Sequence, residues 1–260
     1  MTDFRRSCIG KGRLIGTFAA IPHPVAVEVA AQAGPDFLCI DWEHAQIGRD
    51  TIENLVRAAD VHLVPAIVRV PGHGQEAIAA ALDSGAGGIL VPRVSTTEQA
   101  RAVARAAYYP PQGERGVGPG RAAGYGYRIP DYLARANAEI LVAAQVETAE
   151  GLANVDQIAA TDGIDVIFVG PGDLSVSINA MGPAGAVRLG EAIETIIEAA
   201  LAHGKVAGIF CGKPEDVGRC AAKGASFFIL ASDTLFLGGG VSDGFAAARK
   251  SLETAGQSKV

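Results

Sequence analysis

The chain has 260 residues, of which 49% are hydrophobic and 19% charged, and this balance predicts a folded chain with a large core. The net charge of −6 and the scattered basic residues argue against nucleic-acid binding, because phosphate recognition needs clustered lysine and arginine. The first residues, MTDFRRSCIGKGRL, lack a signal peptide's apolar stretch, and no apolar run approaches the roughly 20 residues of a spanning helix. The four cysteines form no Cys-x-x-Cys pair, so we expect reduced thiols, a cytoplasmic location and no membrane partner.

Short apolar runs that suit β-strands alternate along the chain with amphipathic segments that suit helices. Strands are expected at residues 13–21, 36–43, 63–71, 87–94, 138–148, 164–172, 205–211 and 226–233. Eight βα units in about 250 residues predict an α/β fold, a (β/α)8 TIM barrel that forms a single domain over residues 1–260. An open doubly wound sheet is the alternative. It would usually carry a glycine-rich phosphate turn after the first strand, and AAIPHP is not such a turn.

One connection, residues 110–137, is much longer than the few residues that usually join a helix to the next strand. Such an insertion is normally either disordered or functional. Its glycine and arginine content suits a loop that folds against another surface.

Titratable side chains cluster where the predicted strands end. The second strand ends in DWEH at residues 41–44, the third in Arg69, the fifth in Gln145 and Glu147, and the sixth runs into GPGDLS with Asp173. In a TIM barrel the carboxyl ends of the strands and the loops that follow them form the active-site mouth. All of these side chains are therefore predicted to meet at one mouth.

Glu147 and Asp173 follow adjacent strands, so their carboxylates are expected to lie close together. Two neighbouring carboxylates repel each other unless one takes up a proton or a cation lies between them. Oxygen ligands without a His or Cys pair suit Mg²⁺ or Mn²⁺. Asp173 alone could instead cap a helix. The N–H groups of Gly172 and Asp173 in the GPGDLS turn could hold the carboxylate of a 2-oxo acid that also chelates the metal.

His44 is predicted to be the general base, because an imidazole ordinarily titrates near working pH and this residue follows an apolar run at a strand end. Arg69 would be a costly buried cation unless it stabilises developing enolate charge. Asp41 or Asp83 could orient the imidazole. Asp83 also suits a surface position at a helix end. Glu43 is expected to turn away from the imidazole, because successive side chains diverge along a strand.

Several motifs together resemble a known family over nearly the whole chain. They are DWEHA, VRVP, LDSGAGGILVPRV, YPPQGERGVG, QVETAEGLANVDQIAATDGIDVIFVGPGDLS and FILASDTLFL. They resemble the 4-hydroxy-2-oxoheptanedioate aldolase family of metal-dependent class II pyruvate aldolases. The resemblance implies a TIM barrel whose last helix is exchanged between subunits of a homo-hexamer, a trimer of dimers.

The same resemblance implies a carbon–carbon lyase that cleaves or forms 4-hydroxy-2-oxo acids through a metal-bound enolate. The donor would be pyruvate or hydroxypyruvate, the acceptor an aldehyde, and the cofactor Mg²⁺, Mn²⁺ or Co²⁺. The residues that match the family's motifs are Glu147 and Asp173 as metal ligands and His44 as the base, with Asp41 nearby. Arg69 matches the family's catalytic arginine, and Asp83 matches the aspartate that assists the histidine. The substrate contacts match Gln145, Gly172 and Asp173.

The sequence departs from the family pattern at three places. Gly172 stands where alanine is usual, PGRAAGYG follows RGVG in place of the usual A-R-A-S run, and Phe210 and Cys211 replace smaller or aliphatic residues. We therefore do not transfer to this chain the family's substrate contacts in the region of PGRAAGYG, nor the identity of its aldehyde, whose side of the pocket includes Phe210 and Cys211.

Three other functions compete with this interpretation. A Schiff-base aldolase needs a lysine at a strand end, and only Lys213 lies near the mouth. A related lyase acting on CoA thioesters would need a basic track for the CoA phosphates, which the sequence does not reveal. A non-catalytic barrel that binds a metal and an oxo acid stays open as well.

Overall fold

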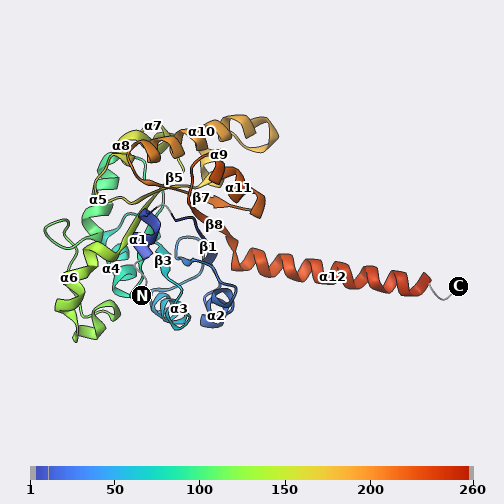
Figure 1. The fold of residues 1–260 in the computed structure, drawn as a ribbon, viewed down its shortest axis with the longest axis horizontal. Coiled ribbons are helices and arrows are strands. Elements are labelled where there is room, and N and C mark those ends of the chain that lie inside the picture. Colours follow the sequence, from blue (N-terminus) through green and yellow to red (C-terminus); the bar gives the residue numbers. More distant parts are fainter. Residues whose placement is uncertain (1–3, 11, 258–260) are drawn as a thin grey trace.

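The computed structural model describes residues 4–10 and 12–257 and contains a closed barrel of eight parallel strands (Figure 1). Each strand pairs with the next along the chain, and the last strand pairs with the first. This order confirms the predicted TIM barrel. The strands are β1 (Leu14–Ala19), β2 (Phe37–Asp41), β3 (Ala66–Arg69), β4 (Gly88–Val91), β5 (Leu141–Val146), β6 (Val166–Val169), β7 (Val206–Cys211) and β8 (Phe227–Ser232).

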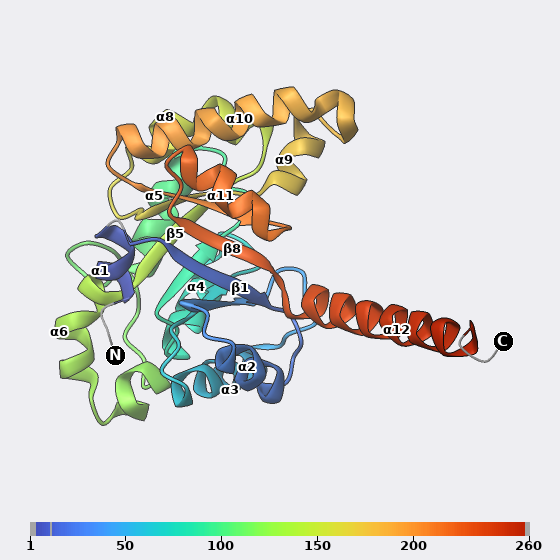
Figure 2. The same cartoon turned by 45° about the vertical axis from the view of Figure 1, so that its right-hand side comes forward.

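Helices between the strands cover the outside of the barrel (Figures 1 and 2). They are α2 (Pro24–Gln32), α3 (Arg49–Val61), α4 (Gln75–Asp83), α5 (Thr97–Ala107), α6 (Ile129–Glu139), α7 (Ala149–Ala153), α8 (Val155–Ala159), α9 (Pro171–Ser177), α10 (Gly182–Ala202) and α11 (Pro214–Ala222). Apart from the start of β1 and parts of β7 and β8, the strands are buried on both faces, which explains why they appear in the sequence as continuous apolar runs rather than alternating ones.

Side chains that point into the barrel form a packed interior that includes Phe37, Phe168 and Phe227. A short first helix, α1 (Phe4–Ile9), adds Phe4 to this cluster, with ring centroids 5.6 Å from Phe37 and 6.5 Å from Phe227. Arg5 on the same helix donates to both carboxylate oxygens of Asp165, at 3.0 and 2.8 Å. The helix therefore closes the end of the barrel at which the strands begin.

Residues 110–137 are ordered rather than loose. They include a 3-10 helix, η1 (Arg121–Gly126), and most of α6. Arg115 is buried, and its guanidinium donates to Asp83 at 2.7 Å and to the Tyr132 hydroxyl at 3.2 Å. Arg121 donates to Asp60 at 2.6 Å, at the end of α3. The arginines thus attach the segment to α3 and α4, which agrees with the expectation of a loop folded against another surface.

The last helix, α12 (Asp233–Gln257), leaves the barrel and projects into solvent in both views (Figures 1 and 2). Its first residue fixes its direction, because the Asp233 carboxylate accepts hydrogen bonds from the backbone N–H groups of Ala20 and Ile21, all within 3.1 Å. Large apolar side chains of the helix stay exposed within one chain: Leu235, Phe236, Leu237, Val241, Phe245 and Leu252.

Two further expectations concern the described residues as a whole. The cysteines Cys8, Cys39, Cys211 and Cys220 are free thiols, as predicted. In the part of the chain that the structure describes, no helix is both long and apolar enough to cross a lipid bilayer.

The Arg115–Asp83 pair gives a stability prediction. The Arg115 side chain is fully buried, so Asp83→Ala would leave an uncompensated buried cation and should lower the free energy of unfolding by about 3 kcal/mol. Asp60→Ala is the matched control, because it removes the carboxylate from Arg121, whose side chain is 19% exposed. Urea denaturation should show a clearly smaller loss for the control. Equal losses would mean that burial of Arg115 does not set the cost.

Candidate active site at the barrel mouth

Strand alternation directs the predicted site residues into the barrel. Asp41 shares the inward face of β2 with Phe37 and Cys39, and Arg69 shares that of β3 with Ile67. A cavity of about 540 Å³ lies where the strands end. The predicted residues that line it are Asp41, His44, Arg69, Gln145, Gly172 and Asp173. The structure therefore brings six of the predicted residues to one mouth.

Asp41 and Arg69 form a buried bidentate ion pair. They are register partners on β2 and β3, with Arg69 Nε 3.0 Å from Asp41 Oδ1 and Nη2 2.7 Å from Oδ2. The guanidinium also lies over the Phe18 ring, with Cζ 4.2 Å from its centroid. Within the described residues Nη1 has no hydrogen-bond partner. The pair thus neutralises the buried cation and fixes its orientation, while one edge of the guanidinium stays available at the cavity.

The position of Glu43 differs from the expectation. Its Oε2 lies 3.6 Å from His44 Nε2 and 3.4 Å from Arg69 Nε, so it faces the imidazole rather than turning away. The strand argument failed because β2 ends at Asp41, and the following residues form a turn without strand alternation. In the described part of the chain, no side-chain hydrogen bond or ion pair joins Asp41 to the imidazole. Its Oδ1 accepts the backbone N–H groups of Glu43 and His44, at 3.2 and 3.1 Å, and so shapes the turn that carries the base.

Glu147 is the most buried carboxylate of the mouth. Its Oε1 accepts the Arg93 backbone N–H at 2.9 Å, and its Oε2 accepts from Gln145 Nε2. Burial, followed by the negative charge of Asp173, raises the pKa of Glu147 to about 7. Burial also raises the pKa of Glu43, and the negative charge of Asp173 adds to this rise. The charge of Asp173 therefore acts on both of these carboxylates.

The donor set at this place fits a hard divalent cation. Gln145 Oε1 and Glu43 Oε2 are both buried without a hydrogen-bond partner in the described part of the chain, so acceptors outnumber donors there. The same residues contain no group of three or more His, Cys, Asp or Glu side chains arranged around one point. Glu147 and Asp173 would thus supply two carboxylates and leave the other coordination positions to water or substrate.

Two glycines of the GPGDLS turn have different roles. A Cβ at Gly170 would lie 2.5 Å from Glu147 Oε2 and 2.7 Å from Gln145 Nε2, so only glycine leaves room for these side chains. A Cβ at Gly172 would meet nothing within 4 Å. The fold therefore does not require glycine at position 172.

Asp83 lies away from the mouth, contrary to the possible contact with His44. It is the last residue of α4, and the outer helices of a barrel run antiparallel to its strands, so the end of α4 lies at the opposite end of the barrel. There it pairs with Arg115. Within one chain Asp83 cannot assist His44, and such a contact would require a second subunit.

Three residues of the site were not predicted from the sequence. They are Phe18 beneath the Arg69 guanidinium, Gly170, whose missing Cβ leaves room for Glu147, and Arg93, whose N–H binds Glu147. Phe18 was hidden in an ordinary apolar run. Arg93 adopts φ = 54°, a left-handed conformation that non-glycine residues rarely take and that no sequence signal announced.

The raised pKa of Glu147 predicts a pH-dependent stability in the absence of metal. The folded state holds this proton up to about pH 7, whereas the unfolded carboxyl loses it near its ordinary value of 4.5. Stability should therefore fall as the pH rises from 4.5 to 7 and stay lower above that range. Glu147→Gln removes this penalty, so with EDTA at pH 8 it should raise the free energy of unfolding by about 1–3 kcal/mol.

The gain should be much smaller at pH 5, because this pH lies only slightly above the ordinary value of 4.5 and most of the penalty builds up between pH 5 and 7. Urea denaturation at both pH values measures it, with the exposed Glu198→Gln as control. A gain of the same size at pH 5 would contradict the assignment to carboxylate ionisation.

Comparison with known proteins agrees with this geometry. Residues 14–237 match the family model described as HpcH/HpaI aldolase/citrate lyase. A 4-hydroxy-2-oxovalerate aldolase of Novosphingobium aromaticivorans is 39% identical over 250 residues, which cover 93% of this chain and 92% of that protein. A hydroxypyruvate/pyruvate aldolase of Deinococcus radiodurans is 39% identical over 236 residues, which cover 90% and 85%.

A solved structure gives the same result. A family protein from Burkholderia cenocepacia has a TM-score of 0.86 and 33% identity, and the match covers 97% of this chain and 98% of the other. These findings confirm the resemblance inferred from the motifs and, with it, the expectation of a carbon–carbon lyase of the aldolase type. The chain belongs to the HpcH/HpaI aldolase/citrate lyase family.

Proposed function

We propose that the protein is a divalent-metal-dependent aldolase that cleaves or forms 4-hydroxy-2-oxo acids, with pyruvate or hydroxypyruvate as donor and an aldehyde as acceptor. The observation that carries the proposal is that the exposed Asp173, the ion-paired Arg69 and the exposed His44 line one cavity. The buried Glu147 lies next to this cavity, because it accepts a hydrogen bond from Gln145, which lines it. The similarity to relatives named as aldolases of this kind supports it.

Glu147 and Asp173 would hold the cation, which can be Mg²⁺, Mn²⁺ or Co²⁺. When bound, the cation would polarise the ketone of the 2-oxo acid. Gln145 lines the same cavity and keeps an unpaired buried oxygen beside Glu147. Gly172 and Asp173 belong to the first turn of α9, whose N–H groups have no intrahelical partner and could bind the substrate carboxylate.

His44 would remove the proton next to the carbonyl, since its imidazole is 60% exposed at the cavity and can reach substrate. Asp41 fixes the backbone of its turn, and Glu43 lies beside the ring. Arg69 would donate from its free edge to the oxygen on which enolate charge develops. Because Asp41 already holds the guanidinium, this donor needs no rearrangement when charge appears.

The cavity supports this class of aldolase over the competing ones. No lysine is among the described residues that line it, so a Schiff-base mechanism has no nucleophile there. Arg69 is the only lysine or arginine among the same residues, and the basic track that CoA phosphates would require is not found in this wall.

The proposal predicts a specific exchange reaction. The protein with Mg²⁺ or Mn²⁺ should exchange the methyl protons of pyruvate in deuterated buffer, as followed by NMR, and EDTA should abolish the exchange. His44→Ala should slow it by about 10²-fold or more, since a positioned base contributes factors of this size. Glu198→Ala, on the exposed surface of α10, is the matched control. Undiminished exchange with EDTA would contradict the metal, and undiminished exchange in His44→Ala would contradict the base.

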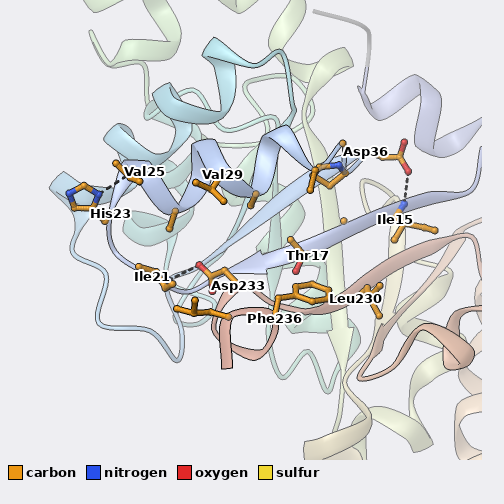
Figure 3. A pocket seen from close by; sticks show the side chains of 17 residues that line it. Ile15, Thr17, Ile21, His23, Val25, Val29, Asp36, Leu230, Asp233 and Phe236 are labelled. Atoms are coloured by element: carbon orange, nitrogen blue, oxygen red, sulfur yellow. Dashed lines mark hydrogen bonds between the residues drawn. The ribbon is translucent and has the colours of Figure 1, made fainter. Parts of the chain in front are cut away.

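We also propose that α12 is exchanged between subunits. An apolar cavity of about 870 Å³ lies beside α2, β1 and the start of α12 (Figure 3), where the eighth helix of a barrel would pack. Val25 and Val29 of α2 and Ile15 of β1 are exposed at this place, at 55%, 66% and 40%. The chain's own α12 is directed away from it by Asp233. An α12 from a second copy would cover these side chains and bury its own apolar residues.

This proposal predicts the outcome of a surface substitution. Phe245→Glu should shift the protein to a smaller species in light scattering coupled to size-exclusion chromatography, because it places a charge among the apolar residues of α12. Val187→Glu is the matched control, since Val187 is a comparably exposed apolar residue of α10. A trimer of dimers predicts a hexameric mass for the wild type. A wild-type monomer, or no change in Phe245→Glu, would contradict helix exchange.

A further inference from the structure

Two of the four cysteines lie on neighbouring elements of one βα unit. Cys211 is the last residue of β7, and Cys220 lies in α11, the helix that follows this strand. Cys211 and Ile209 belong to the apolar layer between the strands and the outer helices, whereas Phe210 belongs to the barrel interior, as strand alternation requires. Cys220 packs against the same apolar layer together with Val217, one helical turn earlier. Both thiols therefore face the layer that separates β7 from α11.

The two thiols are in contact. The S–H group of Cys211 donates a hydrogen bond to the sulfur of Cys220. Cys211 is only 2% exposed, whereas Cys220 is partly exposed at the surface of the helix. The pair thus combines an inner thiol with an outer thiol that a small solute can reach.

The surroundings make Cys220 the reactive member of the pair. The hydrogen bond from Cys211 lowers the pKa of the Cys220 thiol to about 7, and the positive charges of Arg219 and Lys223 add to this effect. The same hydrogen bond, together with burial, raises the pKa of Cys211. Because the thiolate and not the thiol is the nucleophile in cysteine oxidation, Cys220 would react first and leave Cys211 to resolve the product.

Cys8 and Cys39 have neither property. They are 1% and 0% exposed, and burial raises the pKa of both thiols. They therefore serve as internal controls for a reaction at Cys220.

The helix α11 can make the movement that a bond between the two sulfur atoms requires. A disulfide holds its sulfur atoms about 2 Å apart, which is closer than two thiols in hydrogen-bonding contact. Every residue of α11 is at least partly exposed, and an element with few buried contacts shifts at a low cost in free energy. β7 is paired with β6 on one side and β8 on the other. Closure of the bond would thus draw α11 toward β7 and pull on the last residue of the strand.

The end of β7 belongs to the barrel mouth. Phe210, the neighbour of Cys211, lines the cavity there, and its ring centroid lies 5.9 Å from that of Phe18. Phe18 in turn lies under the Arg69 guanidinium. A displacement of the strand end would therefore reach the aromatic wall against which Arg69 is held.

We propose that Cys211 and Cys220 form a reversible disulfide, with a peroxide as oxidant, and that this bond lowers the activity at the barrel mouth. The effect on activity rests on the proposed aldolase function, whereas the formation of the bond does not.

The oxidation takes two steps. The Cys220 thiolate attacks one oxygen of hydrogen peroxide, so that an S–O bond forms, the O–O bond breaks, and the hydroxide that leaves takes up a proton to become water. The product is a sulfenic acid on Cys220. The Cys211 sulfur then attacks the Cys220 sulfur, the S–S bond replaces the S–O bond, and the second hydroxide leaves with the Cys211 proton as water. Two electrons pass from the two thiols to the peroxide.

The bond itself is tested by mass spectrometry of the full chain. Hydrogen peroxide should lower the mass of the wild type by about 2 Da through the loss of two hydrogen atoms, and dithiothreitol should restore it. Trypsin cleaves after Arg219, so a digest without reduction should contain the Cys211 and Cys220 peptides joined together. Cys220→Ser should form no bond, and Cys211→Ala should stop at a sulfenic acid that dimedone labels on Cys220. Cys8→Ala is the control and should behave as the wild type.

The effect on the mouth is tested by the exchange of pyruvate protons with Mg²⁺ after the peroxide has been removed by catalase. The oxidised wild type should exchange about 10-fold more slowly or less, because small misplacements of catalytic groups cost factors of this size or larger. Dithiothreitol should restore the rate, and peroxide should leave the rate of Cys220→Ser unchanged.

Four results would overturn the proposal. They are an unchanged mass of the wild type, a disulfide that involves Cys8, Cys39 or a second chain, an equal loss of exchange in Cys220→Ser, and a complete Cys211–Cys220 bond without slower exchange. A reduced wild type that exchanges no pyruvate protons would instead contradict the proposed function, and the mass would still decide whether the bond forms.

Discussion

The repulsion among three carboxylates at the barrel mouth is the constraint on which the rest of the site depends. Burial raises the pKa of Glu43 and of Glu147, and the negative charge of Asp173 adds to the rise in both. Arg69 cannot neutralise all of them, because Asp41 already binds two of its nitrogen atoms. A site that concentrates negative charge in this way fits a divalent cation.

The fold creates this arrangement because every second side chain of a strand faces into the barrel and because Gly170 has no side chain. Asp41, Arg69 and Gln145 each extend the inward face of a strand whose earlier inward residues are apolar, so the packed interior changes into a polar mouth where the strands end. Gly170 continues the inward face of β6, and its missing Cβ leaves the space that Glu147 and Gln145 occupy. At the other end of the barrel, Phe4 and the Arg115–Asp83 pair close the fold without contributing to the mouth.

The sequence was sufficient where a side chain's position follows from regular geometry. Eight apolar runs gave the barrel, and the placement of Asp41, Arg69, Gln145 and Asp173 at strand ends predicted their convergence. It was insufficient where the chain leaves regular structure. Glu43 lies in a turn just past β2, so alternation gave the wrong direction, and the left-handed Arg93 depends on contacts with a strand distant in sequence. Asp83 has the helix-end position that its sequence context also suggested, but its partner Arg115 comes from an insertion whose fold could not be predicted. The metal and the roles of the site residues stay predictions.

The most direct test of the carboxylate site is the binding of Mn²⁺ to the substrate-free protein, measured by electron paramagnetic resonance of the free ion. The account predicts one Mn²⁺ per chain in the wild type. Combining Glu147→Gln with Asp173→Asn keeps the shape of both side chains and removes their charge, and it should lower the affinity by at least about 100-fold. Replacing residues that only support the ligands of a metal site already changes affinity by about 10- to 100-fold. The pair Glu194→Gln and Glu198→Gln on α10 removes the same charge from the exposed surface and should bind as the wild type does. Wild-type affinity in the Glu147 and Asp173 double variant would contradict the account.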